Sequence, residues 1–103
     1  MRLARVRGNV VSSAKVPGLS SFKLLFVQDI DPQAPSETDT AAGDGDVYVA
    51  IDLAGAGDNE IVLVTMGSAA RVESAGQYAP TDAAVVGIVD IVNYNGRVTY
   101  VKR

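Results

Sequence analysis

The sequence predicts a small all-β domain in which five or six short strands form a closed or partly closed barrel. Three observations lead to this prediction. The hydrophobic fraction is 48% but the aromatic fraction only 6%, so aliphatic side chains must fill the core, and β-branched residues favour sheets. Short apolar runs alternate with turn-forming clusters along the chain. The length of 103 residues fits a single domain, which we expect to cover residues 1–103.

The chain begins with two predicted strands and a long polar loop. The first strand covers Met1–Ser13, with Gly8 marking a bend or bulge. Pro17-Gly18 is a turn signal, and Phe22–Gln28 is the second strand, apolar on both faces at its centre. Asp29–Asp46 contains prolines, glycines and carboxylates and has little apolar surface to bury, which predicts a loop.

Two further strands and a helical turn follow this loop. The strands cover Val47–Leu53 and Ile61–Met66 and flank a Gly-Ala-Gly turn. Because serine side chains accept hydrogen bonds from the first backbone amides of a helix, Ser68 predicts a short helical turn over Ala69–Val72.

The C-terminal part predicts a long strand and a hairpin. Ala84–Tyr94 is the longest predicted strand. Asn95-Gly96 is the strongest hairpin signal in the chain because both residues tolerate positive φ. Arg97–Lys102 then returns as the antiparallel partner.

Several predicted strands lack the alternation of apolar and polar residues that a solitary small barrel needs. The outer face of such a barrel meets water, so every second position should be polar. Some valines cannot all point inward together with their neighbours, namely Val62, Val64, Val86 and Val89. The remaining apolar face needs a cover, and a second copy of the chain is the expected one. We therefore predict self-association.

Charge and hydropathy argue against nucleic-acid and membrane partners. The net charge is −3, and five of the twelve acidic residues lie between Asp31 and Asp46. Nucleic-acid binders usually present a concentrated basic face. Here the basic residues near the two termini can form one modest patch: Arg2, Arg5, Arg7, Lys102 and Arg103. The sequence has neither an apolar stretch of about eighteen residues nor a signal-peptide pattern, so we expect a cytoplasmic protein without a membrane span.

The chain offers little for catalysis. It contains no histidine and no cysteine, so no serine has an activating base and thiolate chemistry is absent. Asp52 and Asp90 end or interrupt apolar strands, and a buried carboxylate needs a partner, for which Arg71 is the candidate. We predict no catalytic residues.

Two kinds of motif partly resemble known binding motifs, one for dinucleotides and one for metal ions. Gly55-Ala56-Gly57-Asp58-Asn59-Glu60 resembles the start of a dinucleotide fingerprint, but a glutamate replaces the third glycine and a strand follows instead of a helix. The carboxylate pairs Asp29/Asp31 and Asp44/Asp46 lack the spacing of an EF-hand loop. We interpret the first motif as a tight turn and the pairs as part of a solvated loop. We therefore expect no cofactor and no metal.

An ordered set of short motifs resembles one known family, and the resemblance covers nearly the whole chain. The motifs are Gly8-Asn9-Val10-Val11, Lys23-Leu24-Leu25-Phe26-Val27-Gln28, Val49-Ala50-Ile51-Asp52, Gly55-Ala56-Gly57, Glu60-Ile61-Val62-Leu63-Val64, Gly67-Ser68-Ala69-Ala70-Arg71 and Asp82-Ala83-Ala84-Val85-Val86-Gly87-Ile88-Val89-Asp90. In this order they resemble the bacterial microcompartment vertex proteins, the EutN/CcmL family.

The resemblance implies a non-catalytic structural protein. Its expected fold is an oligonucleotide-binding-fold-like (OB-like) β-barrel with a short helical turn and a C-terminal hairpin. Five copies are expected to form a ring that caps the vertices of a protein shell in the cytoplasm. The implied partners are therefore the chain itself, as a homopentamer, and the hexameric shell proteins that tile the facets.

The resemblance also indicates which residues meet at the subunit interface or the central opening. Small residues let two backbones approach closely, and an arginine can anchor such a contact with its planar fork of donors. The expected contact residues are Gly55, Ala56, Gly57, Glu60, Gly67, Ser68, Ala69 and Arg71. Three departures from the family pattern are Asp58-Asn59 before the glutamate, Ala69 in place of a serine, and a longer acidic loop.

Two alternatives stay open at this stage. The first is a nucleic-acid-binding module on the same barrel, with bases stacked on aromatic side chains. Its candidate platform consists of Phe22, Phe26, Tyr48 and Tyr100. The second is a small-molecule or metal-dependent enzyme that uses Asp52 and Asp90.

Overall fold

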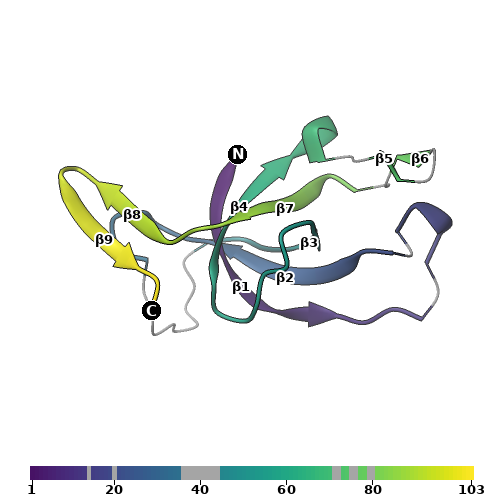
Figure 1. The fold of residues 1–103 in the computed structure, drawn as a ribbon, viewed down its shortest axis with the longest axis horizontal. Coiled ribbons are helices and arrows are strands. Elements are labelled where there is room, and N and C mark those ends of the chain that lie inside the picture. Colours follow the sequence, from purple (N-terminus) through teal and green to yellow (C-terminus); the bar gives the residue numbers. More distant parts are fainter. Residues whose placement is uncertain (14, 20, 36–44, 71–72, 75–76, 79–80) are drawn as a thin grey trace.

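The computed structural model contains a closed five-stranded barrel and a separate C-terminal hairpin (Figure 1). The structure describes residues 1–13, 15–19, 21–35, 45–70, 73–74, 77–78 and 81–103. Around the barrel the strand order is β1-β2-β3-β7-β4. Every neighbouring pair is antiparallel except β3 and β7, which are parallel. This arrangement confirms the predicted all-β barrel with a C-terminal hairpin.

The barrel strands agree closely with the expected segments. They are β1 (Arg2–Val10), β2 (Lys23–Asp29), β3 (Val47–Asp52), β4 (Ile61–Met66) and β7 (Ala83–Ile88). The other elements are the 3₁₀ turns η1 (Pro17–Leu19) and η2 (Gly67–Ala70), the short pair β5 (Glu73–Ser74) and β6 (Gln77–Tyr78), and the hairpin strands β8 (Ile91–Tyr94) and β9 (Arg97–Val101). The helical turn thus begins at Gly67, and Ser68 lies inside it rather than capping it.

A bulge at the middle of β1 confirms the bend expected near Gly8. Val6 pairs with Val27 and Gly8 pairs with Phe26, so Arg7 is an extra residue on β1. Such a bulge increases the local twist and helps a sheet curl into a barrel.

The barrel interior is filled by small and β-branched side chains, as the composition predicts. Its buried cluster consists of Ala4, Val6, Leu25, Val27, Ala50, Ala56, Val62, Val64, Ala83 and Val85. Burying aliphatic groups contributes about 0.8 kcal/mol per methylene, so this cluster is the main stabilising element of the barrel.

Part of the apolar outer face is covered by the chain itself. Ile51 and Ala84 point out of the barrel and form a second buried cluster with Ala70 of η2. Leu19, Phe22 and Leu24 pack against this cluster from the segment around η1 and the start of β2. The expectation that another copy must cover the whole outer face was therefore too broad.

The four valines singled out from the sequence separate into two groups. Val62 and Val64 are fully buried inside the barrel, whereas Val86 is 42% exposed on its outer face and Val89 is half-buried. The separation follows from the bulge between β4 and β7. Leu63 pairs with Gly87 and Val64 with Val85, which leaves Val86 as the extra residue.

The predicted long strand Ala84–Tyr94 is wrong, because β7 and β8 are separate strands. The backbone amide of Val89 still donates to Ile61, the first residue of β4, at 2.8 Å. Beyond that point β4 offers no partner, and the carbonyl of Asp90 instead accepts from the amide of Lys102 at 2.7 Å. The chain therefore changes its pairing partner at Asp90, and the longest strand is β1.

The hairpin of β8 and β9 projects from one end of the barrel, as Figure 1 shows at left. Its turn has the predicted left-handed conformation, with φ of 55° at Asn95 and 76° at Gly96. The molecule is elongated, with extents of 44 × 24 × 22 Å.

Candidate subunit interface

The turn between β3 and β4 is organised by Asp52. Its carboxylate oxygen Oδ1 accepts from the backbone amides of Ala54 at 3.0 Å and Gly55 at 2.9 Å, and Oδ2 accepts from Ala56 at 3.0 Å. Gly55 has φ of 80°, a left-handed conformation that glycine adopts without a steric penalty. The Asp52 side chain is half-buried, and its carboxylate finds its hydrogen-bond donors within its own turn. Its expected partner, Arg71, lies outside the described residues.

The end of the same turn is fixed by Glu60. One carboxylate oxygen accepts from the amide of Gly57 at 2.6 Å, and the other forms an ion pair with the Lys102 ammonium at 2.6 Å. The hydrogen bond from Lys102, and then that from Gly57, lowers the pKa of the Glu60 carboxyl. No local sequence pattern indicates this pair, because 42 positions separate the two residues.

Backbone hydrogen bonds hold the turn against β1. The amide of Asn59 donates to the carbonyl of Val6, and the amide of Val6 donates to the carbonyl of Glu60, both at 2.9 Å. Asn59 has φ of 66°, a left-handed conformation that asparagine adopts more readily than most residues. The Gly-Ala-Gly segment is therefore a tight turn, as interpreted from the sequence.

The expected contact residues fall into two separate places. Gly55, Ala56, Gly57 and Glu60 share the β3–β4 turn, whereas Gly67 and Ser68 lie in η2, at the other end of β4. Six strand residues span about 20 Å, so the two groups do not form one local cluster. Gly67 and Ser68 are exposed, and Gly67 has φ of 67°. The side chain of Ala69 and all of Arg71 lie outside the described part of the structure.

One face of the C-terminal hairpin is apolar and exposed. Ile91 pairs with Val101, and Asn93 pairs with Val98, so these side chains share a face of the two-stranded ribbon. Ile91 is 59% exposed, Val98 57% and Val101 49%. A two-stranded ribbon is marginally stable in water unless something packs on it.

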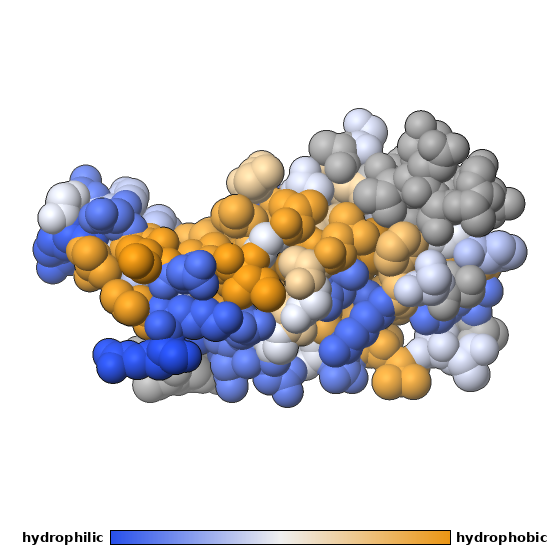
Figure 2. Space-filling model, viewed as in Figure 1, coloured by the Kyte–Doolittle hydropathy of each residue, from blue (hydrophilic) through white to orange (hydrophobic). Residues whose placement is uncertain are grey.

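The apolar hairpin face continues onto the barrel. A groove with a volume of about 550 Å³ lies where β8 leaves the barrel, and it is lined by Leu3, Leu63, Ile88 and Ile91 among others. Figure 2 shows hydrophobic side chains extending from the hairpin, at left, along the barrel. Sequence periodicity did not predict this surface, because it depends on where the hairpin separates from the barrel.

A second exposed apolar patch lies on the outer face of β2 and β3. Phe26 of β2 pairs with Val49 of β3, and both are about 40% exposed. Val47, also on β3, is exposed as well, whereas exposed Val86 lies on β7 beyond the covered cluster of Ile51 and Ala84. The molecule therefore presents apolar surface both on the barrel and on the projecting hairpin.

The proposed base-stacking platform is not assembled. Phe22 packs against the outer cluster of Ile51, Tyr48 packs against the barrel interior, and Phe26 lies on the exposed outer face. Tyr48 donates a hydrogen bond to Asp29 at 2.8 Å, and burial together with this hydrogen bond raises the pKa of Tyr48 to about 12. Arg2 forms an ion pair with the same carboxylate at 2.9 Å.

The described residues also lack the constellation that the enzyme hypothesis requires. Asp52 lies beside Val85, within β7, whereas Asp90 lies beyond the far end of that strand. Within the described ranges, no three acidic side chains come together as a metal site would need. Among the same residues, no helix has the length and hydropathy to cross a membrane.

Comparison with known proteins identifies the family. The family model described as "Ethanolamine utilisation protein EutN/carboxysome" matches residues 1–90. The carboxysome shell vertex protein CcmL of Synechocystis sp. is 47% identical over all of this chain and 96% of its own length. The shell vertex protein EutN of Escherichia coli is 42% identical over 99% of this chain and all of its own.

A solved structure agrees with these relatives. The GrpN pentameric microcompartment shell protein of Rhodospirillum rubrum superposes with a TM-score of 0.72 at 42% identity, over 90% of this chain and 96% of its own. These relatives are structural shell proteins and not enzymes, and they give no support to a nucleic-acid-binding role. The chain belongs to the EutN/CcmL family of microcompartment shell vertex proteins.

Proposed function

We propose that this protein is a structural component that forms a homopentamer and caps the five-fold vertices of a bacterial microcompartment shell in the cytoplasm. The observation that carries the proposal is the exposed apolar face of the C-terminal hairpin, formed by Ile91, Val98 and Val101. A projecting ribbon with such a face needs a partner to pack on it. The names of the relatives support a partner that is another copy of the chain.

The position of the apolar surfaces favours a ring. Hairpin and barrel patches are different surfaces, so a contact between them is head-to-tail, and such contacts close into rings when the rotation between copies permits. We propose that a neighbouring copy covers the hairpin face and the groove beside it.

The exposed small residues at both ends of β4 fit close contacts within the ring. We propose that Gly55, Gly57, Gly67 and Ser68 lie at the subunit contact or around the central opening, where small side chains let backbones approach. Ala56 is buried and Glu60 is paired within its own chain, so their contribution is to fix the turn that carries these contacts. For Ala69 and Arg71 we propose a place at the subunit contact or the central opening, where Arg71 would anchor the contact with its planar fork of donors.

Hexameric shell proteins are the proposed partners of the ring. A sheet of six-fold tiles stays flat, and five-fold units supply the curvature that closes it. On this reasoning the contribution of the protein is geometric rather than chemical.

A mass measurement in solution tests the assembly. Multi-angle light scattering should give five times the chain mass of 10.7 kDa at micromolar concentration. Val98→Asp should shift the mass toward the monomer, because it places a charge in a desolvated contact. Val16 is 55% exposed and directly precedes η1, whose dark-blue ribbon lies at the right in Figure 1, away from the hairpin. Val16→Asp is therefore a matched control.

The two measurements test two claims: that the protein forms a homopentamer, and that the hairpin is its contact surface. A monomeric wild-type protein would refute the homopentamer. A pentamer that Val98→Asp leaves intact would retain the ring but refute the hairpin as its contact surface.

A further inference from the structure

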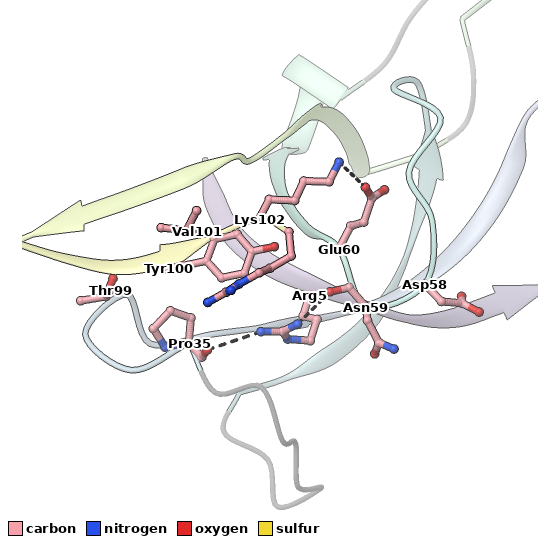
Figure 3. A pocket seen from close by; sticks show the side chains of 10 residues that line it. Arg5, Pro35, Asp58, Asn59, Glu60, Thr99, Tyr100, Val101 and Lys102 are labelled. Carbon is pink, nitrogen blue, oxygen red and sulfur yellow. Dashed lines mark hydrogen bonds and ion pairs between the residues drawn. The ribbon is translucent and has the colours of Figure 1, made fainter.

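A cavity between the β3–β4 turn and β9 holds a buried arginine that forms no ion pair with a carboxylate of the described residues (Figure 3). The cavity has a volume of about 490 Å³, which is within the usual range of ligand sites. Its walls come from Arg5 of β1, from Pro35, from residues 58–60 at the end of the β3–β4 turn and from the C-terminal residues 99–103.

Arg5 is unusual because it is only 5% exposed and yet is not neutralised. Its Nη1 donates to the carbonyl of Asn59 at 2.7 Å and its Nη2 donates to the carbonyl of Pro35 at 3.4 Å. The buried Nε has no hydrogen-bond partner among the residues that the structure describes. A guanidinium carries five N–H donors, so most of its hydrogen-bonding capacity is unused. Buried charges in proteins are normally paired, since desolvating an unpaired ion is costly.

The other charged groups around the cavity do not supply the missing anion. Glu60 is already paired with Lys102. The Asp58 carboxylate points away from Arg5 in Figure 3. Arg103 adds a second cation that has no ion pair with the described residues. Among the side chains that line the cavity, three are cationic (Arg5, Lys102 and Arg103) and two are anionic (Asp58 and Glu60), so the lining side chains carry one net positive charge in a protein whose net charge is −3.

We propose that this cavity binds a carboxylate group. Arginine matches a carboxylate with its planar fork of donors, and a second cation at the same cavity strengthens the attraction. Pro35, Tyr100 and Val101 add apolar surface to the walls, which suits an organic carboxylate better than a fully hydrated inorganic ion. The carboxylate comes either from a small organic acid or from an acidic side chain of another copy of the chain.

The experiment uses succinate as the small carboxylate, with sodium chloride and inorganic phosphate at the same ionic strength as controls. Two quantities are measured on the wild-type protein: the melting temperature and the ¹⁵N–¹H resonance of Arg5 Nε. Arg5→Met keeps an unbranched apolar stem but removes the guanidinium and its charge. Arg97 is exposed on the hairpin and lies outside the cavity, so Arg97→Met is the matched control.

If a free acid is the ligand, a tenfold excess of succinate over its Kd raises the melting temperature by about 5 °C or more. It also shifts the Arg5 Nε resonance. Both effects disappear in Arg5→Met and persist in Arg97→Met. Should Arg5→Met fail to fold, the Nε resonance of the wild-type protein decides the question.

If another copy supplies the carboxylate, succinate has no effect, but Arg5→Met dissociates the assembly at concentrations where Arg97→Met stays associated. The proposal is overturned if succinate has no effect and Arg5→Met leaves the assembly intact. It is also overturned if phosphate or chloride stabilises the protein as well as succinate does. The oligomeric mass of the wild-type protein is measured separately. A result that refutes the pentamer can therefore be distinguished from one that refutes the carboxylate site.

Discussion

Replacing Asp52 tests whether the β3–β4 turn depends on a single carboxylate. In Asp52→Ala, three backbone amides lose their acceptors, which lie between 2.9 and 3.3 Å away. The amide of exposed Gly55 can bind water instead, whereas Ala56 is only 3% exposed, so its amide bears much of the cost of an unmet hydrogen bond. Such a cost is about 1–3 kcal/mol, and the half-buried amide of Ala54 adds about 1 kcal/mol. We therefore expect the free energy of unfolding to fall by about 2–4 kcal/mol.

Urea denaturation followed by circular dichroism measures this change. All variants must be compared at one protein concentration, because the stability of an oligomer depends on it. Asp52→Asn keeps one acceptor oxygen and should lose about half as much stability. Asp90 is exposed, so Asp90→Ala should change stability by less than about 0.5 kcal/mol. A loss below about 0.5 kcal/mol in Asp52→Ala would show that the carboxylate does not hold the turn.

Two further predictions concern pH and backbone conformation. Because the folded-state pKa of Tyr48 is raised to about 12 from an ordinary value near 10, the stabilisation from its neutral hydroxyl is complete below about pH 10 and is lost toward pH 12. Ultraviolet titration of tyrosinate should show a late ionisation that is lost in Tyr48→Phe; a titration curve that keeps this late step in Tyr48→Phe would contradict the prediction. Gly67→Ala should lower the free energy of unfolding by about 1–2 kcal/mol, because the residue has φ of 67°. Gly57→Ala should lower it by less. Equal denaturation midpoints for the two variants would contradict this prediction.

The local parts of the fold were predictable because their causes are local in sequence. Ile61–Met66 was predicted with the bounds that the structure shows, since a turn precedes it and a glycine with positive φ follows it. The Asn95-Gly96 hairpin was predicted for the same reason. Asp52 could have been interpreted more sharply, because aspartate just before a glycine-containing turn commonly accepts from backbone amides two or three residues later.

The incorrect or missed features depend on contacts between distant segments. The end of β7 is decided by where β4 begins, so no inspection of Ala84–Tyr94 alone reveals the break at Asp90. The pairing of Glu60 with Lys102 and the burial of Arg5 are likewise decided by the path of the C-terminal hairpin. Such features emerge only after the barrel has closed.

The outer face of the barrel shows how these two kinds of feature combine. Lack of alternation correctly indicated that apolar side chains would point outward, but it did not distinguish positions that the chain covers itself from positions that it leaves open. Ile51 belongs to the first group, because η1 and η2 fold over it. Val98 belongs to the second, because the hairpin leaves the barrel before its apolar face meets another element. The surface that a partner copy must cover is therefore the hairpin and the groove at its base. A single charge introduced there should destabilise the proposed pentamer more than a charge elsewhere.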